Sequence, residues 1–365
     1  MTAYLVLLLL VFLVFLLIGG VAKRQKGALC VIFAMLAVVM ACRAPSVGTD
    51  TMTAISVIKQ AIMTPFPQSW RFVGGVFEYA PVYALWCKGV WAVVPSVQAV
   101  LAANSLVICL CFAFFFREFS ENPAMAAVLF LLSYTYLTAF NIMRQELAVG
   151  VCLVAFVLWS KRKRAAAILL AALAIGIHGT AVVFALSCVV LLSVLRKRDV
   201  APSRMLAWAL AIGLILRIAY IPLTSVFFGI FYRYGEMYSI SSTTYTSQGR
   251  ASVLYLAILM YFVLELVRRR EAFLVGGVQK QVLFFAFLAI SLRLLFFDLA
   301  LMVRIAGYFT PFLLCSLSNA LQENIRRDRD VFLPYLLISL MVAYYVALLL
   351  SNSGGVVPYE LWSGV

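Results

Sequence analysis

Apolar stretches long enough to cross a lipid bilayer recur along the whole of this sequence. A transmembrane helix needs about 20 apolar residues, with a range of about 17 to 25. Only 12% of the residues are charged and 65% are hydrophobic, whereas a soluble domain has about 25% charged residues. A water-soluble fold cannot bury that much apolar surface. We therefore predict an all-α polytopic membrane protein that forms a single integral membrane domain over residues 1–365.

Short clusters of Lys and Arg lie between the apolar stretches and predict how the chain threads the bilayer. Such clusters are typical of cytoplasmic loops, and we place all five there: 23–26, 161–164, 196–198, 268–270 and 326–329. An even number of crossings between neighbouring clusters gives about 12 transmembrane helices with both chain ends outside. The predicted spans are 4–22, 27–42, 96–116, 124–140, 143–159, two short helices within 165–195 that meet near His178-Gly179, 204–226, 251–267, 281–297, 305–321 and 331–350.

The positive charge of the chain is explained by this threading. Its net charge of +15 is concentrated in the loop clusters, so we expect no nucleic-acid partner. The first apolar run, 4–21, is followed rather than preceded by Lys and Arg, which favours an uncleaved first span over a signal peptide.

Two segments are predicted on the outer side of the membrane. The first, 43–95, comprises an outer-face loop and an interfacial segment. Its part 72–94 is apolar but interrupted by Gly, Pro and charged residues, which favours a helix or a hairpin at the outer interface. The second, 227–250, is a long outer loop.

Charged residues outside the five clusters indicate a binding function. Most of them fall on the outer half or in outer loops, where positive charge is usually depleted. An ionisable group at membrane depth costs roughly 2.5–3.5 kcal/mol, and Arg binds phosphate in bidentate fashion. Several tolerated arginines therefore predict an anionic partner. The set comprises Arg43, Asp50, Lys59, Arg71, Glu78, Arg144, Glu146, His178, Arg217, Arg233, Glu236, Arg250, Arg293, Asp298 and Arg304.

Several of these residues allow both a structural and a functional interpretation. In one interpretation Thr49 or Asp50 caps a helix that begins near Thr51; in the other, Asp50 and Arg43 lie at the mouth of an external cavity. His178, the only histidine, is either a hydrogen-bonded helix-end residue or an acid/base group. Arg144 and Glu146 are two positions apart and do not share a helix face, so Glu146 is not expected to neutralise Arg144. Snorkelling of Arg144 to the interface is the structural alternative.

A second group lies in the last third of the chain. Arg304 and Tyr308 are four positions apart, so they share a helix face, and both are expected to point along the outer end of the predicted span 305–321. An ion pair of Asp298 with Arg293 or with Arg304 is the competing structural interpretation.

Several chemistries are excluded by missing motifs. The sequence has no Walker loop, Rossmann glycine pattern, HExxH motif or serine nucleophile elbow. The carboxylates show no metal-ligand spacing, so we predict no metal and no cofactor. The eight cysteines lie mostly in apolar segments, as small buried hydrophobic residues do.

Five short motifs, in order, resemble the EpsG family of exopolysaccharide polymerases, which is related to the Wzy-type O-antigen and capsule polymerases. They cover about 40–312 and are Arg43 with Val47-Gly48-Thr49-Asp50-Thr51; Glu78 with Pro81 and Tyr83; the run 141–148 with Arg144; Ile177-His178-Gly179-Thr180; and Arg304 with Tyr308-Phe309. Gly179 departs from the small hydroxylated residue expected there, and Thr180 is the nearest substitute.

The resemblance implies a GT-C-like glycosyltransferase of the bacterial inner (cytoplasmic) membrane. Such a protein joins oligosaccharide repeat units carried on undecaprenyl diphosphate at the periplasmic or outer face, without metal or nucleotide sugar. The expected partners are the lipid-linked donor and acceptor glycans, membrane lipids, a chain-length regulator and a flippase.

On this hypothesis the charged residues acquire roles. The candidates for holding the diphosphate are Arg43, Arg144, Arg293 and Arg304 with Tyr308. The candidates for the base are Asp50, Glu78 and His178, of which Asp50 and Glu78 are favoured. Tyr232, Tyr234, Tyr238 and Tyr245 either shape a sugar cleft or are ordinary interfacial tyrosines.

Three other activities remain as alternatives. They are a related GT-C transferase or O-antigen-type ligase, a membrane acyltransferase that uses His178 as its base, and a transporter or flippase. A transporter needs substrate access from both faces, whereas the charges in this chain are concentrated on one.

Overall fold

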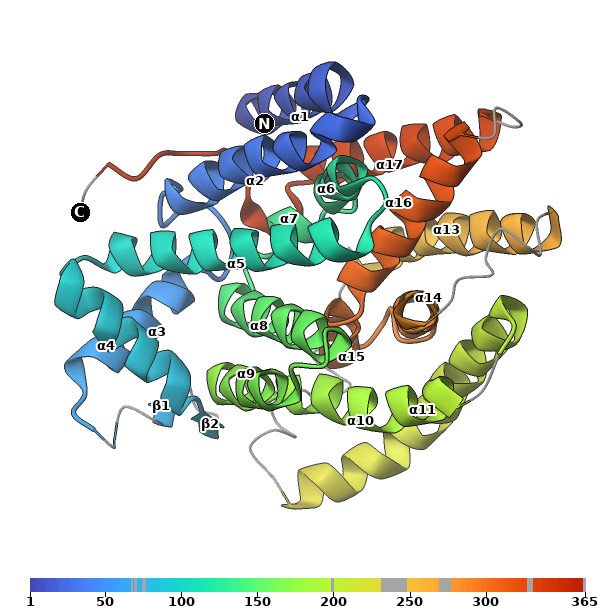
Figure 1. The fold of residues 1–365 in the computed structure, drawn as a ribbon. Helices are drawn as coiled ribbons and strands as arrows, with labels where there is room; N and C mark the ends of the chain where they lie inside the picture. Colours follow the sequence, from blue (N-terminus) through green and yellow to red (C-terminus); the bar gives the residue numbers. More distant parts are fainter. Residues whose placement is uncertain are drawn as a thin grey trace. The chain divides into compact units, whose positions relative to one another are not determined.

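The computed structural model of the chain describes residues 1–66, 68, 71–73, 77–197, 200–230, 248–268, 277–326 and 331–363 (Figure 1). This described part is helical apart from one short hairpin, which confirms the all-α prediction. Most of the predicted outer loop 227–250, with its four tyrosines, lies outside the described residues.

The chain divides into two compact units, which are treated separately below. Unit 1 comprises Met1–Ala185 and Val342–Val365, and unit 2 comprises Leu186–Met341. Apolar helices build both units, and the single membrane domain stays a prediction.

Unit 1 is a helical bundle with a small β-hairpin. Its elements are α1 (Thr2–Val14), η1 (Phe15–Gly19), η2 (Ala22–Arg24), α2 (Gln25–Ala41), α3 (Thr51–Met63), β1 (Arg71–Val73), β2 (Phe77–Tyr79), α4 (Pro81–Val93), α5 (Val97–Phe119), α6 (Pro123–Leu132), α7 (Thr135–Thr138), α8 (Met143–Ser160), α9 (Arg164–Ile177), the start of α10 (Ala181–Lys197), the end of α17 (Phe332–Leu350) and η5 (Ser353–Gly355).

Unit 2 contains the rest of α10 and α17. Its other helices are α11 (Pro202–Ile230), α13 (Gln248–Arg268), α14 (Val278–Leu295), α15 (Ala300–Gly307) and α16 (Thr310–Arg326).

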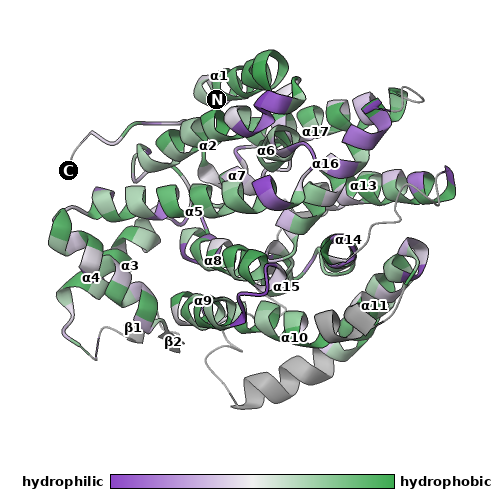
Figure 2. Cartoon of the chain, viewed as in Figure 1, coloured by the Kyte–Doolittle hydropathy of each residue, from purple (hydrophilic) through white to green (hydrophobic). Residues whose placement is uncertain are grey.

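Long apolar helices confirm the prediction of a polytopic membrane protein. Within the described ranges, eight helices are long and apolar enough to cross a bilayer, or nine if α15 and α16 form one span with a 51° bend. Figure 2 shows hydrophobic colouring along the helices and hydrophilic colouring mainly at their ends and connections.

The predicted number of about 12 spans is not confirmed, because some predicted spans are broken into short helices. The predicted span 124–140 consists of α6 and α7, which are separated where Tyr134 adopts a positive φ of 65°. A left-handed residue cannot continue a right-handed helix. The stretch 165–195 divides at His178-Gly179, as predicted, into α9 and α10.

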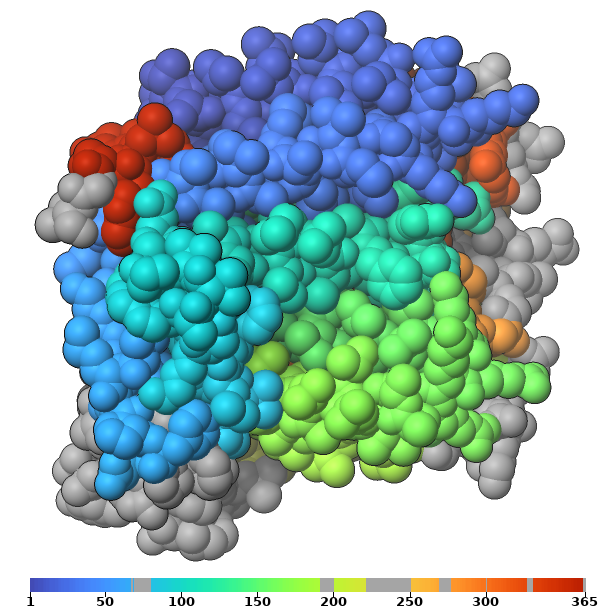
Figure 3. All heavy atoms as spheres, turned by 60° about the vertical axis from the view of Figure 1, so that its left-hand side comes forward, coloured from blue at the N-terminus to red at the C-terminus, as the bar shows by residue number. Residues whose placement is uncertain are grey.

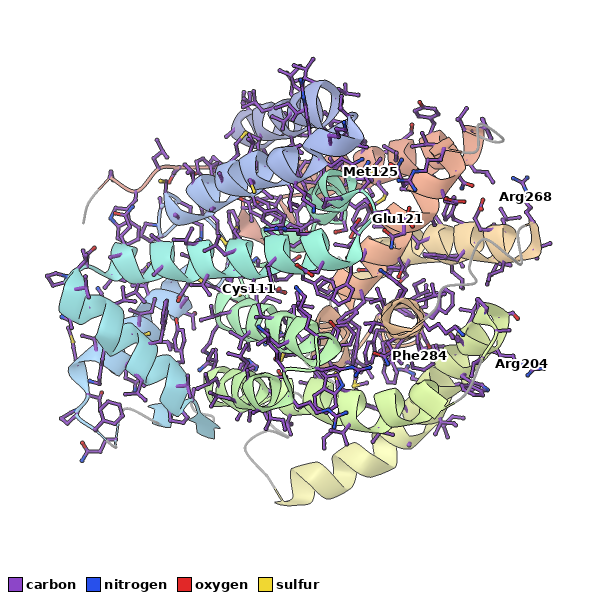
Figure 4. All side chains as sticks on the ribbon, in the orientation of Figure 1. Cys111, Glu121, Met125, Arg204, Arg268 and Phe284 are labelled. Atoms are coloured by element: carbon purple, nitrogen blue, oxygen red, sulfur yellow. The ribbon has the colours of Figure 1, made fainter. Side chains whose placement is uncertain are left out.

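The core of unit 1 is packed by aromatic and small side chains. The Phe130 ring lies 5.7 Å from that of Phe33 on α2 and 4.9 Å from that of Phe112 on α5. A Cβ at Gly150 would lie 2.9 Å from the Cβ of Cys111, whose position on α5 is labelled in Figure 4. Small residues permit this close approach of α8 to α5.

The two described basic clusters of unit 1 lie at one end of its bundle. Lys161, in the turn between α8 and α9, forms a 2.7 Å ion pair with Glu118 near the end of α5. Gly19, close to the cluster 23–26, lies against Ala124 at the start of α6, which follows α5 directly. The opposite end carries the loop 42–50, the β1–β2 hairpin and the end of α9. Unit 1 thus separates its basic clusters from the segment predicted to face outward.

In unit 2, exposed arginines mark the starts or ends of helices. Figure 4 shows Arg204 near the start of α11 and Arg268 at the end of α13, and both side chains are exposed. Arg268 belongs to one of the predicted cytoplasmic clusters. Arg293, in contrast, lies in the last turn of α14, and the Tyr255 ring beneath it lies in the first half of α13. Arg293 is therefore near the end of unit 2 away from Arg268.

Candidate functional site

The first candidate residue, Asp50, ends a tight turn at the start of α3. Gly48 has a φ of +98°, which L side chains rarely adopt. Asp50 occupies the N-cap position of α3, but its side chain makes no capping hydrogen bond to the described backbone. The Thr51 hydroxyl instead donates a 2.6 Å hydrogen bond to the Val47 carbonyl. The predicted helix start is thus confirmed. The Asp50 carboxylate is half-buried and does not cap the helix.

The second, Arg43, is buried rather than presented to a substrate. Its side chain is 1% exposed, and its guanidinium lies 4.7 Å from the Phe140 ring. It donates to the Met40 carbonyl and, at 3.5 Å, to that of Phe140. Burial lowers the pKa of this guanidinium to about 10, so it keeps its charge at neutral pH. This position favours a structural role, in which Arg43 connects the end of α2 to the segment before α8.

Arg144 lies in the first turn of α8, beside an aromatic cluster. Its guanidinium is 5.8 Å from the ring of Tyr83 on α4, and its side chain is half-buried. The Tyr83 hydroxyl accepts from the Asn104 amide at 3.2 Å, and the amide oxygen accepts from Trp86 Nε1 at 2.7 Å. These bonds fix α4 against α5, and α4 in turn supplies the aromatic face beneath Arg144. Glu146 is 2% exposed.

His178 ends α9 in an extended conformation. Its Nδ1 is hydrogen-bonded to the Thr180 hydroxyl at 2.8 Å, which matches the structural interpretation of a helix-end histidine and gives Thr180 a partner. A Cβ at Gly176 would collide with the Val82 side chain, so the end of α9 lies against the start of α4.

Glu78 is placed by its backbone alone. It lies in β2, paired in antiparallel register with Phe72, three residues before α4 begins. The hairpin followed by a helix matches both forms predicted for 72–94. Its side chain lies outside the described part of the structure.

Contacts between neighbouring elements bring these candidates to one end of unit 1. The Asp50 turn contacts Asn141, which comes just before α8 and Arg144. Arg144 lies over α4, and α4 contacts α9 directly before His178. The helices α3, α4, α8 and α9 therefore gather residues from four of the five motifs at the end opposite the basic clusters.

In unit 2, Asp298 has a partner that the sequence interpretation missed. Arg217 of α11 donates two hydrogen bonds to its carboxylate, at 3.0 and 2.8 Å. The competing prediction of a local pair with Arg293 or Arg304 is therefore wrong: 81 residues separate the true partners, and no local pattern signals such a contact.

Arg293 lies in the same unit but, unlike Arg217, forms no ion pair with a described residue. It is half-buried over the Tyr255 ring, at 5.3 Å. Among the described residues it has no hydrogen-bond or ion-pair partner, and its Nε is buried.

Arg304 and Tyr308 lie on either side of a helix break. α15 ends at Gly307, and Tyr308 is its C-cap residue with a buried side chain. The predicted span 305–321 is interrupted, because α15 and α16 meet at a 51° bend. Arg304 is half-buried in the last turn of α15.

Metal ligands do not cluster in the described ranges. No group of three or more His, Cys, Asp or Glu side chains there is arranged to hold an ion. The predicted independence from metal stays a prediction.

Comparison with protein families matches residues 26–361 to the EpsG family. Neither the curated proteins nor the solved structures contain a significant match to the chain. The family match covers nearly the whole sequence and includes all five motifs. The chain therefore belongs to the EpsG family.

Proposed function

We propose that this chain polymerises oligosaccharide repeat units carried on undecaprenyl diphosphate. Its family implies an exopolysaccharide polymerase, and its apolar helices make it a multi-pass membrane protein. The finer proposal is a metal-independent, GT-C-like glycosyltransferase of the bacterial inner membrane, with its site at the periplasmic or outer face. The lipid-linked donor and acceptor are its substrates, and a chain-length regulator and a flippase are its proposed partners.

One observation carries the proposal most directly. In unit 1 the Asp50 turn, Arg144 and His178 gather at the end opposite the basic clusters 23–26 and 161–164. Basic clusters in short loops are typical of the cytoplasmic side. The opposite end, where a lipid diphosphate in the outer leaflet would present its charge, therefore carries the candidate residues.

Asp50 is the base that the geometry favours. Its carboxylate is half-buried and does not cap α3, whereas Nδ1 of His178 is bound to Thr180. In the proposed step an acceptor hydroxyl oxygen attacks the anomeric carbon, its proton passes to Asp50, and the carbon–oxygen bond to the diphosphate breaks. The bonding electrons leave with undecaprenyl diphosphate. Glu78 and His178 remain the other candidates.

Arg144 is proposed to stabilise the leaving group. A guanidinium binds phosphate oxygens in bidentate fashion, and preorganised positive charge lowers the barrier as negative charge develops. The guanidinium lies 5.8 Å from the Tyr83 ring, and the cation–π attraction helps to orient it. Arg43 is assigned a positioning role instead, because its donors point to backbone carbonyls.

Considered by itself, unit 2 offers a second set of anion-binding groups. Arg293 has no hydrogen-bond or ion-pair partner within the described chain, and Arg304 lies beside the bend that begins at the buried Tyr308. We propose that both arginines bind oxygens of the lipid-linked substrate.

The test is chain extension by the purified protein. Undecaprenyl-diphosphate-linked repeat units are supplied without nucleotide sugar, with and without EDTA, and product length is measured. We expect longer chains in both arms. No extension by a folded, monodisperse protein would overturn the polymerase assignment, and sensitivity to EDTA would overturn metal independence.

Variants then test the site. Arg144→Ala and Arg304→Ala should lose extension while still inserting into the membrane. Arg204→Ala is the matched control, because it removes an exposed guanidinium at the start of α11. Full activity in both site variants would remove the proposed diphosphate-binding role.

The alternative activities predict different results. If His178→Ala abolishes activity while Asp50→Asn does not, the acyltransferase mechanism is favoured. Labelling of a cysteine beside Arg144 from the cytoplasmic side would favour a transporter.

A further inference from the structure

The segment after α17 lies across the candidate site of unit 1. We call residues 351–363 the strap. It turns at Gly354 and Gly355, both of which have positive φ, and then runs beside the loop 42–50. In the space-filling view of Figure 3 its red atoms lie at the surface against the blue atoms of the first helices.

Backbone hydrogen bonds join the strap to both ends of this loop. At the near end, the Ala44 amide donates to the Glu360 carbonyl, and the Trp362 amide donates to the Cys42 carbonyl, each at 2.8 Å. At the far end, next to Asp50, the amides of Gly48 and Thr49 donate to strap carbonyls at 2.8 and 3.0 Å. The turn that presents Asp50 is thus held by a segment about 300 residues away in the sequence.

Asn141 completes the connection with its side-chain amide. Its Oδ1 accepts from the Asp50 backbone amide at 3.3 Å, and its Nδ2 donates to the Gly354 carbonyl at 2.9 Å. It comes two residues before α8, which carries Arg144. One side chain therefore joins the turn, the strap and the start of α8.

The two glycines beside Asn141 leave no room for side chains. A Cβ at Gly48 would lie 2.7 Å from Asn141 Oδ1, and a Cβ at Gly354 would lie 2.6 Å from Asn141 Nδ2. Any side chain at either glycine would therefore displace the Asn141 amide.

We propose that Asn141 and the strap are the positioning elements of Asp50: they fix the backbone of its turn so that the carboxylate is held in one place for the acceptor hydroxyl. This rests on the polymerase function proposed above. A misplacement of a reacting group by about 1 Å can cost about 100-fold in rate, so the contacts around Asn141 should affect turnover more than substrate binding.

Two variants test the proposal. Asn141→Asp keeps an acceptor for the Asp50 amide but loses the donor to Gly354, and Gly354→Ala places a methyl group against Asn141. Gly27→Ala is the matched control, because nothing lies within 4 Å of a Cβ there.

The first readout is chain extension. We expect kcat to fall roughly 10- to 100-fold in both variants, with KM for the lipid-linked substrate changed by less than about twofold and with normal insertion. If Gly354→Ala fails to fold, Asn141→Asp carries the test. Unchanged kcat in a folded Asn141→Asp protein would overturn the proposal.

The second readout, amide hydrogen exchange of the peptide 44–54, does not depend on activity. Exchange should rise there in both variants, while exchange in α5 stays at the wild-type level. Unchanged exchange would overturn the coupling of the strap to the turn. If the wild type extends no chains, the polymerase function and the role of Asp50 fall, and the exchange result still decides whether the strap fixes the turn.

Discussion

Replacing Gly48 by Ala is a sharp test of the turn that presents Asp50. At a φ of +98° an L side chain is strained, and left-handed backbone costs about 1–2 kcal/mol. The new methyl group would also lie 2.7 Å from Asn141 Oδ1 and 2.8 Å from Thr51 Oγ1. At least one of these side chains must move, and a lost hydrogen bond costs about 0.5–1.5 kcal/mol. We therefore expect Gly48→Ala to lower the free energy of unfolding by about 2–3 kcal/mol.

Gly89→Ala is the matched control for this prediction. Gly89 lies inside α4, and nothing lies within 4 Å of a Cβ there. Since Ala is favoured over Gly in a helix by about 0.5–1 kcal/mol, the control should be at least as stable as the wild type. Thermal unfolding in detergent measures both, and Gly48→Ala should unfold about 3–4 °C lower. An unfolding midpoint for Gly48→Ala equal to that of the control would refute the geometry of the turn.

Three other predictions concern Arg144 of unit 1, the Arg217–Asp298 ion pair of unit 2 and the packing around Gly213 of unit 2. Arg144→Ala should reduce chain extension by about 10²- to 10³-fold, with Arg144→Lys between it and the wild type because a single ammonium cannot bind in bidentate fashion; equal activity of all three would contradict the role. A double-mutant cycle of Arg217→Ala and Asp298→Ala should give a coupling above about 1 kcal/mol in unfolding experiments, because the pair is bidentate; a coupling near zero would show that it is screened as at an ordinary surface. Gly213→Ala should destabilise by about 1–3 kcal/mol, because its Cβ would collide with Ser291 Oγ, and adding Ser291→Ala should restore part of the loss; no restoration would place the strain elsewhere.

The sequence predicts the helices well, because hydropathy acts locally. Runs of apolar residues mark most of the long helices, and the hinge at His178 follows from a stretch too long for one span. The break at Tyr134 is not predictable in the same way. No Gly or Pro, which usually signals an interruption, lies beside it, and the conformation of Tyr134 is fixed by distant contacts, such as the hydrogen bond from its hydroxyl to the Ser353 carbonyl.

In the candidate site, too, the sequence predicts local features and misses contacts between distant segments. The residue types of the site were identifiable because charges are rare in an apolar chain, and Asp50, Arg144 and His178 do lie at one end of unit 1. Their long-range contacts were not identifiable. Buried Arg43 resembles a binding residue until its carbonyl partners are seen, and Asn141 acts through segments remote in sequence. Pairing across such distances leaves no periodic pattern to read.

The helix α6 has a consequence for how the protein is assembled in the cell. All ten of its residues are buried within unit 1, and at 1.5 Å per residue it is about 15 Å long, half the thickness of the hydrocarbon core. Such a helix is too short to be recognised as a span by the insertion machinery and has no face left for lipid. We therefore expect α6 to enter the bilayer only after neighbours such as α2 and α5 are in place, which adds a folding step inside the membrane to the biogenesis of unit 1.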